Sequence, residues 1–274
     1  MESERTEIQA TKIAGVQDLL KFVGEDMSLA ALKEYVIVPF CKTVQGMSAQ
    51  ELKDEHGEGA VVLQPGGVKI GDRNKTFLFV PIFFYTEFRK WADRKDTAQM
   101  IVESTYDPTS PVAKKARDHE LWNEVYEEDV ALPEDKQKKY RYVEHLCFIG
   151  KIYSGDQKDT QCMISFQKGD FRIGRSFASG AQMRKVDTGE GLVQVPLWAQ
   201  VWEMKVSLRD KNDNKWWGID PCNPGEGVSP VIDPELYAAH SQAYKDLAEA
   251  HATNRLKVDG QDNDPEEEME SKDF

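Results

Sequence analysis

The sequence has few residues of the kinds that build metal centres and disulfide frameworks. Its four cysteines are widely scattered and never lie two to four positions apart, as zinc-binding motifs require. Its five histidines show neither a His-x-x-x-His nor a His-Glu-x-x-His spacing. We therefore expect reduced, structural thiols, no bound metal and no cofactor.

The sequence also lacks the segments that direct a chain to a membrane. It has no run of about 18 apolar residues, and its first residues are not a basic region followed by an apolar stretch. We expect a cytoplasmic protein that does not contact a membrane.

Motifs for common enzymes are missing too. Neither the phosphate-binding Gly-x-x-x-x-Gly-Lys-Ser/Thr loop nor the Gly-x-Ser-x-Gly nucleophile motif occurs. We expect a protein that is not an enzyme. A metal-dependent nuclease remains an alternative, because Asp72 and Glu87 could hold a cation near Lys90, although the spacing is loose.

What the chain does have is 274 residues with 40% hydrophobic content, which is enough to bury a large core. Most of its patterns are those of strands. We predict strands at 36–40, 68–70, 76–85, 142–153, 160–167, 171–177 and 196–209, with the last turning through 210–214 into a hairpin at 215–217. This spacing predicts a mainly β fold with peripheral helices, of the α+β class.

Helical patterns lie around these strands. We predict helices at 11–23 and 27–35, a short one at 47–56 with Ser48 as its N-cap, and one around 112–125 within an inserted segment, 96–137. A last helix within 233–256 starts at Asp233, which is followed by a proline. Residues 1–258 are thus predicted to form one domain.

Charge is segregated along the chain, although the net charge is −13. Residues 69–95 carry seven basic against three acidic side chains, and residues 138–217 carry fourteen against nine. These two segments are also the richest in aromatic residues. Basic side chains can follow the phosphates of a single strand while rings stack on its unpaired bases. Aromatic residues also build ordinary cores, so we assign most of the rings to the interior.

We therefore predict one groove that binds a single-stranded nucleic acid. Its expected phosphate contacts are Arg73, Lys75, Arg89, Lys90 and Lys95 from the first segment and Lys151, Lys168, Arg172, Arg175, Arg184, Lys185 and Lys215 from the second. The expected stacking rings are Trp91, Tyr153, Phe171, Trp216 and Trp217.

The last sixteen residues, 259–274, have a composition typical of a disordered tail. They hold eight acidic residues and one lysine, and they have too little apolar surface to fold. The chain closes on Asp273-Phe274, where a ring beside a free carboxylate suits capture by a basic-rimmed pocket.

An acidic tail that closes on Asp-Phe resembles the ends of bacteriophage and bacterial single-stranded DNA-binding proteins. The body also resembles phage proteins of early replication modules. The segments that carry this likeness are Val38-Pro39-Phe40, Gln45-Gly46-Met47-Ser48, Gln64-Pro65-Gly66-Gly67, Phe83-Phe84 and Val143-Glu144-His145-Leu146.

The resemblance implies an OB-like antiparallel barrel that coats single-stranded DNA without sequence preference during phage replication or recombination. It also implies a tail that recruits replication or recombination proteins, and it leaves a homo-oligomer open. The alternative is a phage virion or scaffold protein that does not bind DNA. With its net charge of −7, the tail is further expected to occupy the DNA groove when DNA is absent.

Overall fold

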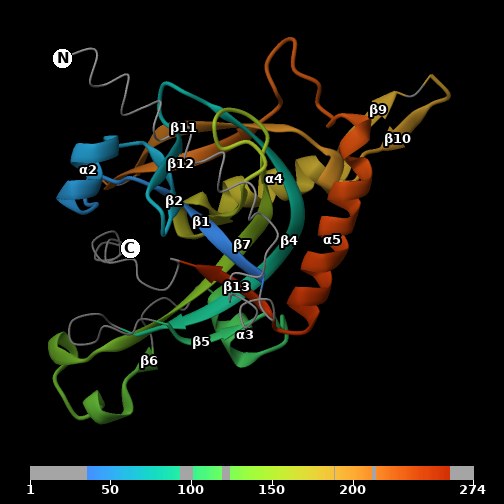
Figure 1. Ribbon diagram of the computed structural model, residues 1–274. Coiled ribbons are helices and arrows are strands. Elements are labelled where there is room, and N and C mark those ends of the chain that lie inside the picture. The colour runs from blue at the N-terminus through green and yellow to red at the C-terminus, as the bar shows by residue number, and fades with distance from the viewer. Residues whose placement is uncertain (1–35, 93–100, 119–123, 188, 212–213, 260–274) are drawn as a thin grey trace, which may run out of the picture. The chain divides into compact units, whose positions relative to one another are not determined.

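The computed structural model describes residues 36–92, 101–118, 124–187, 189–211 and 214–259 (Figure 1). The described residues from Ile37 onward belong to one compact unit. The helices expected at 11–23 and 27–35, the candidate Lys95, and the tail from residue 260 through Asp273 and Phe274 lie outside the described residues.

Within the described residues the fold is mainly β, as the sequence predicts, and one curled sheet of eleven strands dominates it. Its continuous path runs β12-β11-β4-β7-β8-β1-β2-β3, with β13 beside β1, β5 beside β4 and β6 beside β7. The strands are β1 (Val36–Thr43), β2 (Val61–Gln64), β3 (Val68–Gly71), β4 (Phe77–Trp91), β5 (Ile101–Thr105), β6 (Glu124–Val125), β7 (Lys139–Ile152), β8 (Gln161–Phe166), β11 (Trp202–Lys211), β12 (Asn214–Cys222) and β13 (Leu256–Asp259).

The pairing in this sheet is largely antiparallel, and Phe40 of β1 faces Met163 of β8 in a parallel pairing. The path has two free ends among the described strands, at β12 and β3. The predicted closure into an OB-like barrel is therefore not confirmed.

The long strand β4 forms the spine of the sheet, together with its antiparallel partner β7. The apolar run predicted at 76–85 continues as strand to Trp91. Pro81 lies in it without breaking it, because a register shift falls between Pro81 and Phe83, where a missing N–H is tolerated. Gly150 faces Pro81, and a Cβ there would lie only 2.2 Å from the carbonyl oxygen of Val80. Glycine therefore allows the two strands to approach at this point.

Three of the four described α-helices overlap predicted helices, and the fourth replaces a predicted strand. The four are α2 (Gln50–His56), α3 (Pro111–Arg117), α4 (Phe171–Met183) and α5 (Tyr237–Ala252). The helix predicted around 112–125 ends at Arg117, and Glu124–Val125 form a strand instead. Ser110 caps α3 by accepting a hydrogen bond from the amide of Ala113. Asp233 is extended and is followed by a 3₁₀ turn at Pro234–Leu236 that leads into α5, close to the prediction.

The N-cap predicted for α2 is wrong. The N-cap position of α2 is Ala49, which makes no side-chain capping bond. The Ser48 hydroxyl instead accepts a hydrogen bond from the amide of Gln45 at 2.8 Å. The Ser48 hydroxyl therefore stabilises the turn before α2, although the capping-box spacing predicted that it would cap the helix.

The strand predicted at 171–177 is also wrong, because this segment is the start of helix α4. Gly174, Phe177 and Ala181 are the buried residues of α4, and their spacing of three and four is that of a helix face. Gly174 lies against Phe166 of β8, where a Cβ would come within 2.5 Å of the Phe166 Cβ. The close fit of this helix face against the sheet favours a helix at 171–183. The local alternation of residues in the sequence does not show that fit.

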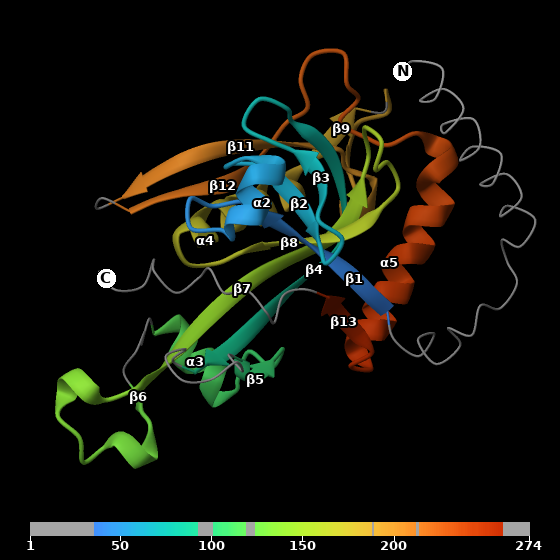
Figure 2. The same ribbon diagram turned by 60° about the vertical axis from the view of Figure 1, so that its left-hand side comes forward.

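The two long helices lie on different sides of β4. Figure 1 shows α4 inside the curve of the sheet and α5 running along the outside of β4. The main core cluster fills the space under α4 and includes Phe79, Phe148, Phe166, Phe177 and Met204. Figure 2 shows α3 and β5 at the end of β4 and β7 that lies away from the β11–β12 hairpin. Among the described helices, none is long and apolar enough to cross a bilayer.

Candidate functional site

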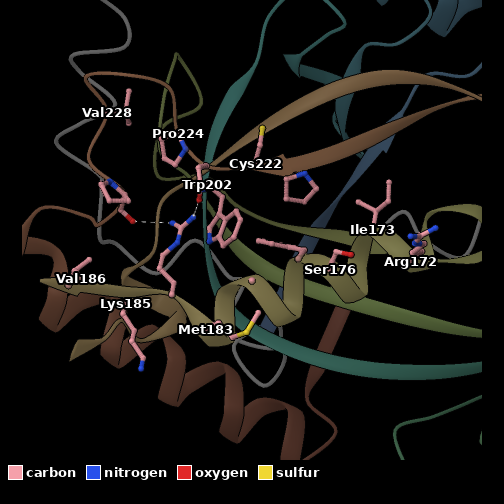
Figure 3. A pocket seen from close by; sticks show the side chains of 16 residues that line it. Arg172, Ile173, Ser176, Met183, Lys185, Val186, Trp202, Cys222, Pro224 and Val228 are labelled. Atoms are coloured by element: carbon pink, nitrogen blue, oxygen red, sulfur yellow. Dashed lines mark hydrogen bonds between the residues drawn. The ribbon is translucent and has the colours of Figure 1, made fainter. Parts of the chain in front are cut away.

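A groove of about 1130 Å³ lies beside helix α4 (Figure 3). One face of α4 forms its floor, and Trp202 at the start of β11 forms its inner wall. The opposite rim comes from the end of β12 and the proline-containing segment 221–230. The remaining lining comes from β9 (Lys185–Asp187), which pairs with β10 (Leu192–Gln194) in a separate two-stranded ribbon.

The charge of this groove is of one sign. Its lining includes Arg172, Arg184 and Lys185, and among the described residues that line it there is no aspartate or glutamate. Figure 3 shows Arg172 toward one end of α4 and Lys185 beyond the other, with Trp202 between them. The thirteen residues of α4 span on the order of 20 Å. The groove is therefore an extended cationic track in a protein whose net charge is −13.

Arg184 links the walls of the groove. Its guanidinium lies 3.8 Å from the centroid of the Trp202 ring and donates hydrogen bonds to the carbonyl oxygen of Val201 and the side chain of Asn223. A longer bond of 3.3 Å reaches the carbonyl oxygen of Pro230. Burial lowers the pKa of Arg184 to about 10, so the group stays protonated at neutral pH. Arg184 thus adds a positive charge to the groove and also holds the segment 221–230 beside α4.

The groove offers binding groups rather than an acid–base pair. Its described lining contains no histidine or carboxylate that could transfer a proton. Cys222 lines it, but burial raises the pKa of this thiol, so it is not an activated nucleophile. No cluster of metal-ligating side chains occurs in the described parts of the chain. Asp72, which the sequence offered as a possible cation ligand, forms an ion pair with Lys69 at 2.7 Å.

Most predicted contacts from the first positive segment lie elsewhere. Arg89 is 4% exposed and forms a bidentate pair with Glu87, at 2.9 and 2.8 Å. Trp91 is 2% exposed, so in this conformation it has no open face for a base. Lys90 bonds to Glu124 at 2.8 Å and lies 3.7 Å from the centroid of the Tyr140 ring. Lys90 thus links β4 to β6 and β7, whereas Arg89 is paired within β4.

Arg73 and Lys75 are the predicted contacts of that segment that are exposed among the described residues. They occupy the turn between β3 and β4, and neither lines the α4 groove. The structure therefore does not bring the described cations of the first segment into the groove with those of the second.

Several predicted rings of the second segment have structural contacts. The Trp216 indole N–H donates to Asp170 at 3.3 Å, and its ring packs on Gly169. Trp217 packs against the main core cluster, as does Phe171. The Tyr153 hydroxyl donates to Asp233 at 3.0 Å. All four rings are half-buried.

The other predicted cations of the second segment are distributed over several elements. Arg175 is exposed on α4 three residues after Arg172, and it extends the positive side of that helix. Lys151 is half-buried in β7, and Lys168 is half-buried in the turn before α4. Lys215 is exposed in β12 and pairs with Asp210 at 3.6 Å.

Sequence reasoning missed the apolar part of the groove. Met183, the last residue of α4, lines the groove. Pro221, Pro224 and Pro230 line it from the facing segment, which the sequence identified only as a linker. Prolines and glycines indicate a connection without showing what it packs against. No pattern in the sequence indicated that this connection is one wall of the groove.

Comparison with known proteins gives one result. Residues 24–253 match the model of a family described as Pam3 phage gp34-like protein. No curated protein matches the chain, and no solved structure matches it. The family match spans α4, both walls of the groove and nearly all of the described sheet. Since it covers well over half of the chain, the protein belongs to the Pam3 phage gp34-like family.

Proposed function

We propose that the protein binds single-stranded DNA in the α4 groove and acts in phage DNA replication or recombination. The observation that carries this proposal is the described lining of the groove, in which Arg172, Arg184 and Lys185 meet no carboxylate. Membership of a phage protein family and the acidic composition of residues 259–274 are consistent with it.

The distribution of charge is the physical reason. A chain with net charge −13 repels a polyanion at long range, so binding requires a local surface where cations outnumber carboxylates. Binding releases the counterions condensed on the phosphates, so the affinity for single strands should fall steeply as salt rises. A track along a helix on the order of 20 Å long can contact several consecutive phosphates.

The fold and the tail extend the proposal. A curled, largely antiparallel sheet is compatible with the OB-like architecture that the phage resemblance implies. The tail, with a net charge of −7, would compete with DNA for the cationic groove at low salt and recruit replication or recombination proteins once DNA displaces it.

Two readouts test the proposal on the full chain. The first is a titration with oligo-dT, in which quenching of tryptophan fluorescence reports binding, repeated with duplex DNA and over a range of salt concentrations. The second is alkylation of Cys222 by a maleimide. Cys41, Cys147 and Cys162 are buried, whereas Cys222 is half-buried in the groove, so its modification reports on that site.

We expect oligo-dT to bind more tightly than duplex DNA, to lose affinity as salt rises and to slow the alkylation of Cys222. Binding without protection of Cys222 would move the DNA site away from the groove. No binding of either DNA at low salt would refute the proposal and favour a virion or scaffold protein.

A further inference from the structure

The β9–β10 ribbon carries unusually exposed aliphatic side chains. Leu192 is 69% exposed and Val193 is 53% exposed, and Met183, just before the ribbon, is 70% exposed. In the register of the ribbon, Leu192 faces Asp187 and Val193 faces Val186. Because neighbouring residues of a strand point to opposite faces, Leu192 and Val193 place apolar surface on both sides of the ribbon.

Such a ribbon has little to stabilise it alone. Its two strands pair with each other and, among the described residues, with no strand of the main sheet. A two-stranded ribbon is marginally stable in water, and apolar side chains on both faces add surface that favours a partner. The ribbon therefore has the features of a contact element.

The ribbon is continuous with the cationic groove. Lys185 and Val186 belong to β9 and line the groove, and Met183 and Arg184 lead from α4 directly into the ribbon. The described lining of the groove contains no carboxylate, and the ribbon carries Asp187 opposite Leu192. A ligand that follows the groove therefore meets cations first and then aliphatic side chains.

Resting on the proposed function, we infer that Leu192 and Val193, with Met183, contact the unpaired bases of a single strand whose phosphates lie along Arg172 and Lys185. An unpaired base has two apolar faces that are covered in a duplex. Contacts to those faces tolerate any sequence, because every base has them. Charge complementarity along the adjoining groove favours this occupant over an apolar protein surface.

The test compares ribbon and control variants on two DNA ligands. Leu192→Ser with Val193→Ser removes the apolar side chains of the ribbon. Val130→Ser with Leu132→Ser is the matched control, because these residues are 66% and 42% exposed and lie away from the ribbon. Each protein is titrated with oligo-dT and with an abasic oligonucleotide of the same length, at several salt concentrations.

We expect the ribbon variant to bind oligo-dT about tenfold more weakly than the unsubstituted protein, which is the loss expected for one or two uncovered aliphatic side chains. Its affinity for the abasic strand and the slope of affinity against salt should be unchanged, because neither depends on the bases. The control variant should match the unsubstituted protein throughout.

Each other outcome has a distinct meaning. If the unsubstituted protein binds oligo-dT and the ribbon variant binds it equally well, the inference about the ribbon is wrong and the proposed function stands. Equal losses on oligo-dT and the abasic strand would also overturn it. A change in molar mass of the ribbon variant by light scattering would identify the ribbon as a contact between copies instead. If the unsubstituted protein binds no DNA, the proposed function itself fails.

Discussion

The buried Glu87–Arg89 pair and the α4 groove come from the two positively charged segments of the chain, and they use their cations in opposite ways. On β4, Arg89 meets a carboxylate two residues away, and both side chains are almost fully buried, at 5% and 6% exposure. Beside α4, the described lining brings cations together with no carboxylate among them. Similar composition therefore yields a structural ion pair in one region and an unneutralised track in the other.

The comparison shows that the charge of a segment does not identify a binding surface. Lys90 is neutralised by Glu124, which lies 34 residues away in a segment of negative charge. Arg209 pairs with Asp170 and Asp220, and burial raises the pKa of Asp170 although the positive charge of Arg209 acts to lower it. The cations that remain available to a ligand are those for which the fold brings no such carboxylate.

The largest effect is expected where the charges are buried. Glu87→Gln should lower the free energy of unfolding by about 3 kcal/mol, because Arg89 loses the carboxylate that compensates its buried charge. Urea unfolding would measure this. Glu103→Gln, at an exposed position of neighbouring β5, is the control and should change stability by less than about 0.5 kcal/mol. Equal stabilities of the two variants would contradict a structural role for the pair.

In the groove, reversing the charge of exposed cations should weaken DNA binding and leave the free energy of unfolding unchanged. Arg172→Glu with Lys185→Glu should weaken oligo-dT binding roughly 30-fold at low salt, or about 2 kcal/mol, and reduce its salt dependence. Lys136→Glu with Lys245→Glu makes the same change in net charge at exposed sites outside the groove. If both double variants lose affinity equally, only the overall charge matters and the groove is not the site.

Arg184 lies between these two extremes, since it is partly buried and neutral groups are its hydrogen-bond partners. Arg184→Ala should lower the free energy of unfolding by about 1.5 kcal/mol, through loss of the bonds to Val201 and Asn223 and of the Trp202 contact. Thermal unfolding followed by tryptophan emission would measure this. Arg184→Lys keeps the charge without the planar fork, so it should restore only part of the stability. Full restoration by lysine would contradict the geometric argument.

A smaller effect on stability, which depends on pH, is expected on the outer side of the sheet, where α5 packs. Burial lowers the pKa of both His240 and His251. The charge of Lys151 lowers the pKa of His240 further, and that of Asp159 raises it. The charge of Glu87 raises the pKa of His251. Because the folded state holds these protons less tightly, its stability should decrease as pH falls below about 6.5.

The expected loss between pH 7.5 and pH 5.5 is on the order of 0.5 kcal/mol, after allowance for solvent screening. Urea unfolding at the two pH values measures it, and His240→Gln with His251→Gln should reduce it. Glu124 does not contribute to this loss, since its pKa is lowered to about 2 and it stays ionised at both pH values. An undiminished pH dependence in the double variant would assign it to other groups.

Local patterns predicted much of the sheet and parts of the helices. Alternation and turn residues located β7, β8 and the β11–β12 hairpin, and the Asp233-Pro234 pair located the start of the last helix. The same reasoning assigned 171–177 to a strand, because the apolar residues of a short segment fit both the two-residue repeat of a strand and the 3.6-residue repeat of a helix. The fit of Gly174 against β8 decides for a helix, and that fit depends on the sheet being in place.

The candidate site was predictable only as a set of cations. The sequence by itself determined a mainly β chain with segregated charge, and it placed Arg172, Arg184 and Lys185 among the candidates. Only the tertiary structure decided that these three line one groove while Arg89 and Lys90 are neutralised. The physical reason is that charge pairing depends on distances between residues far apart in sequence, and the register and curvature of the whole sheet set those distances.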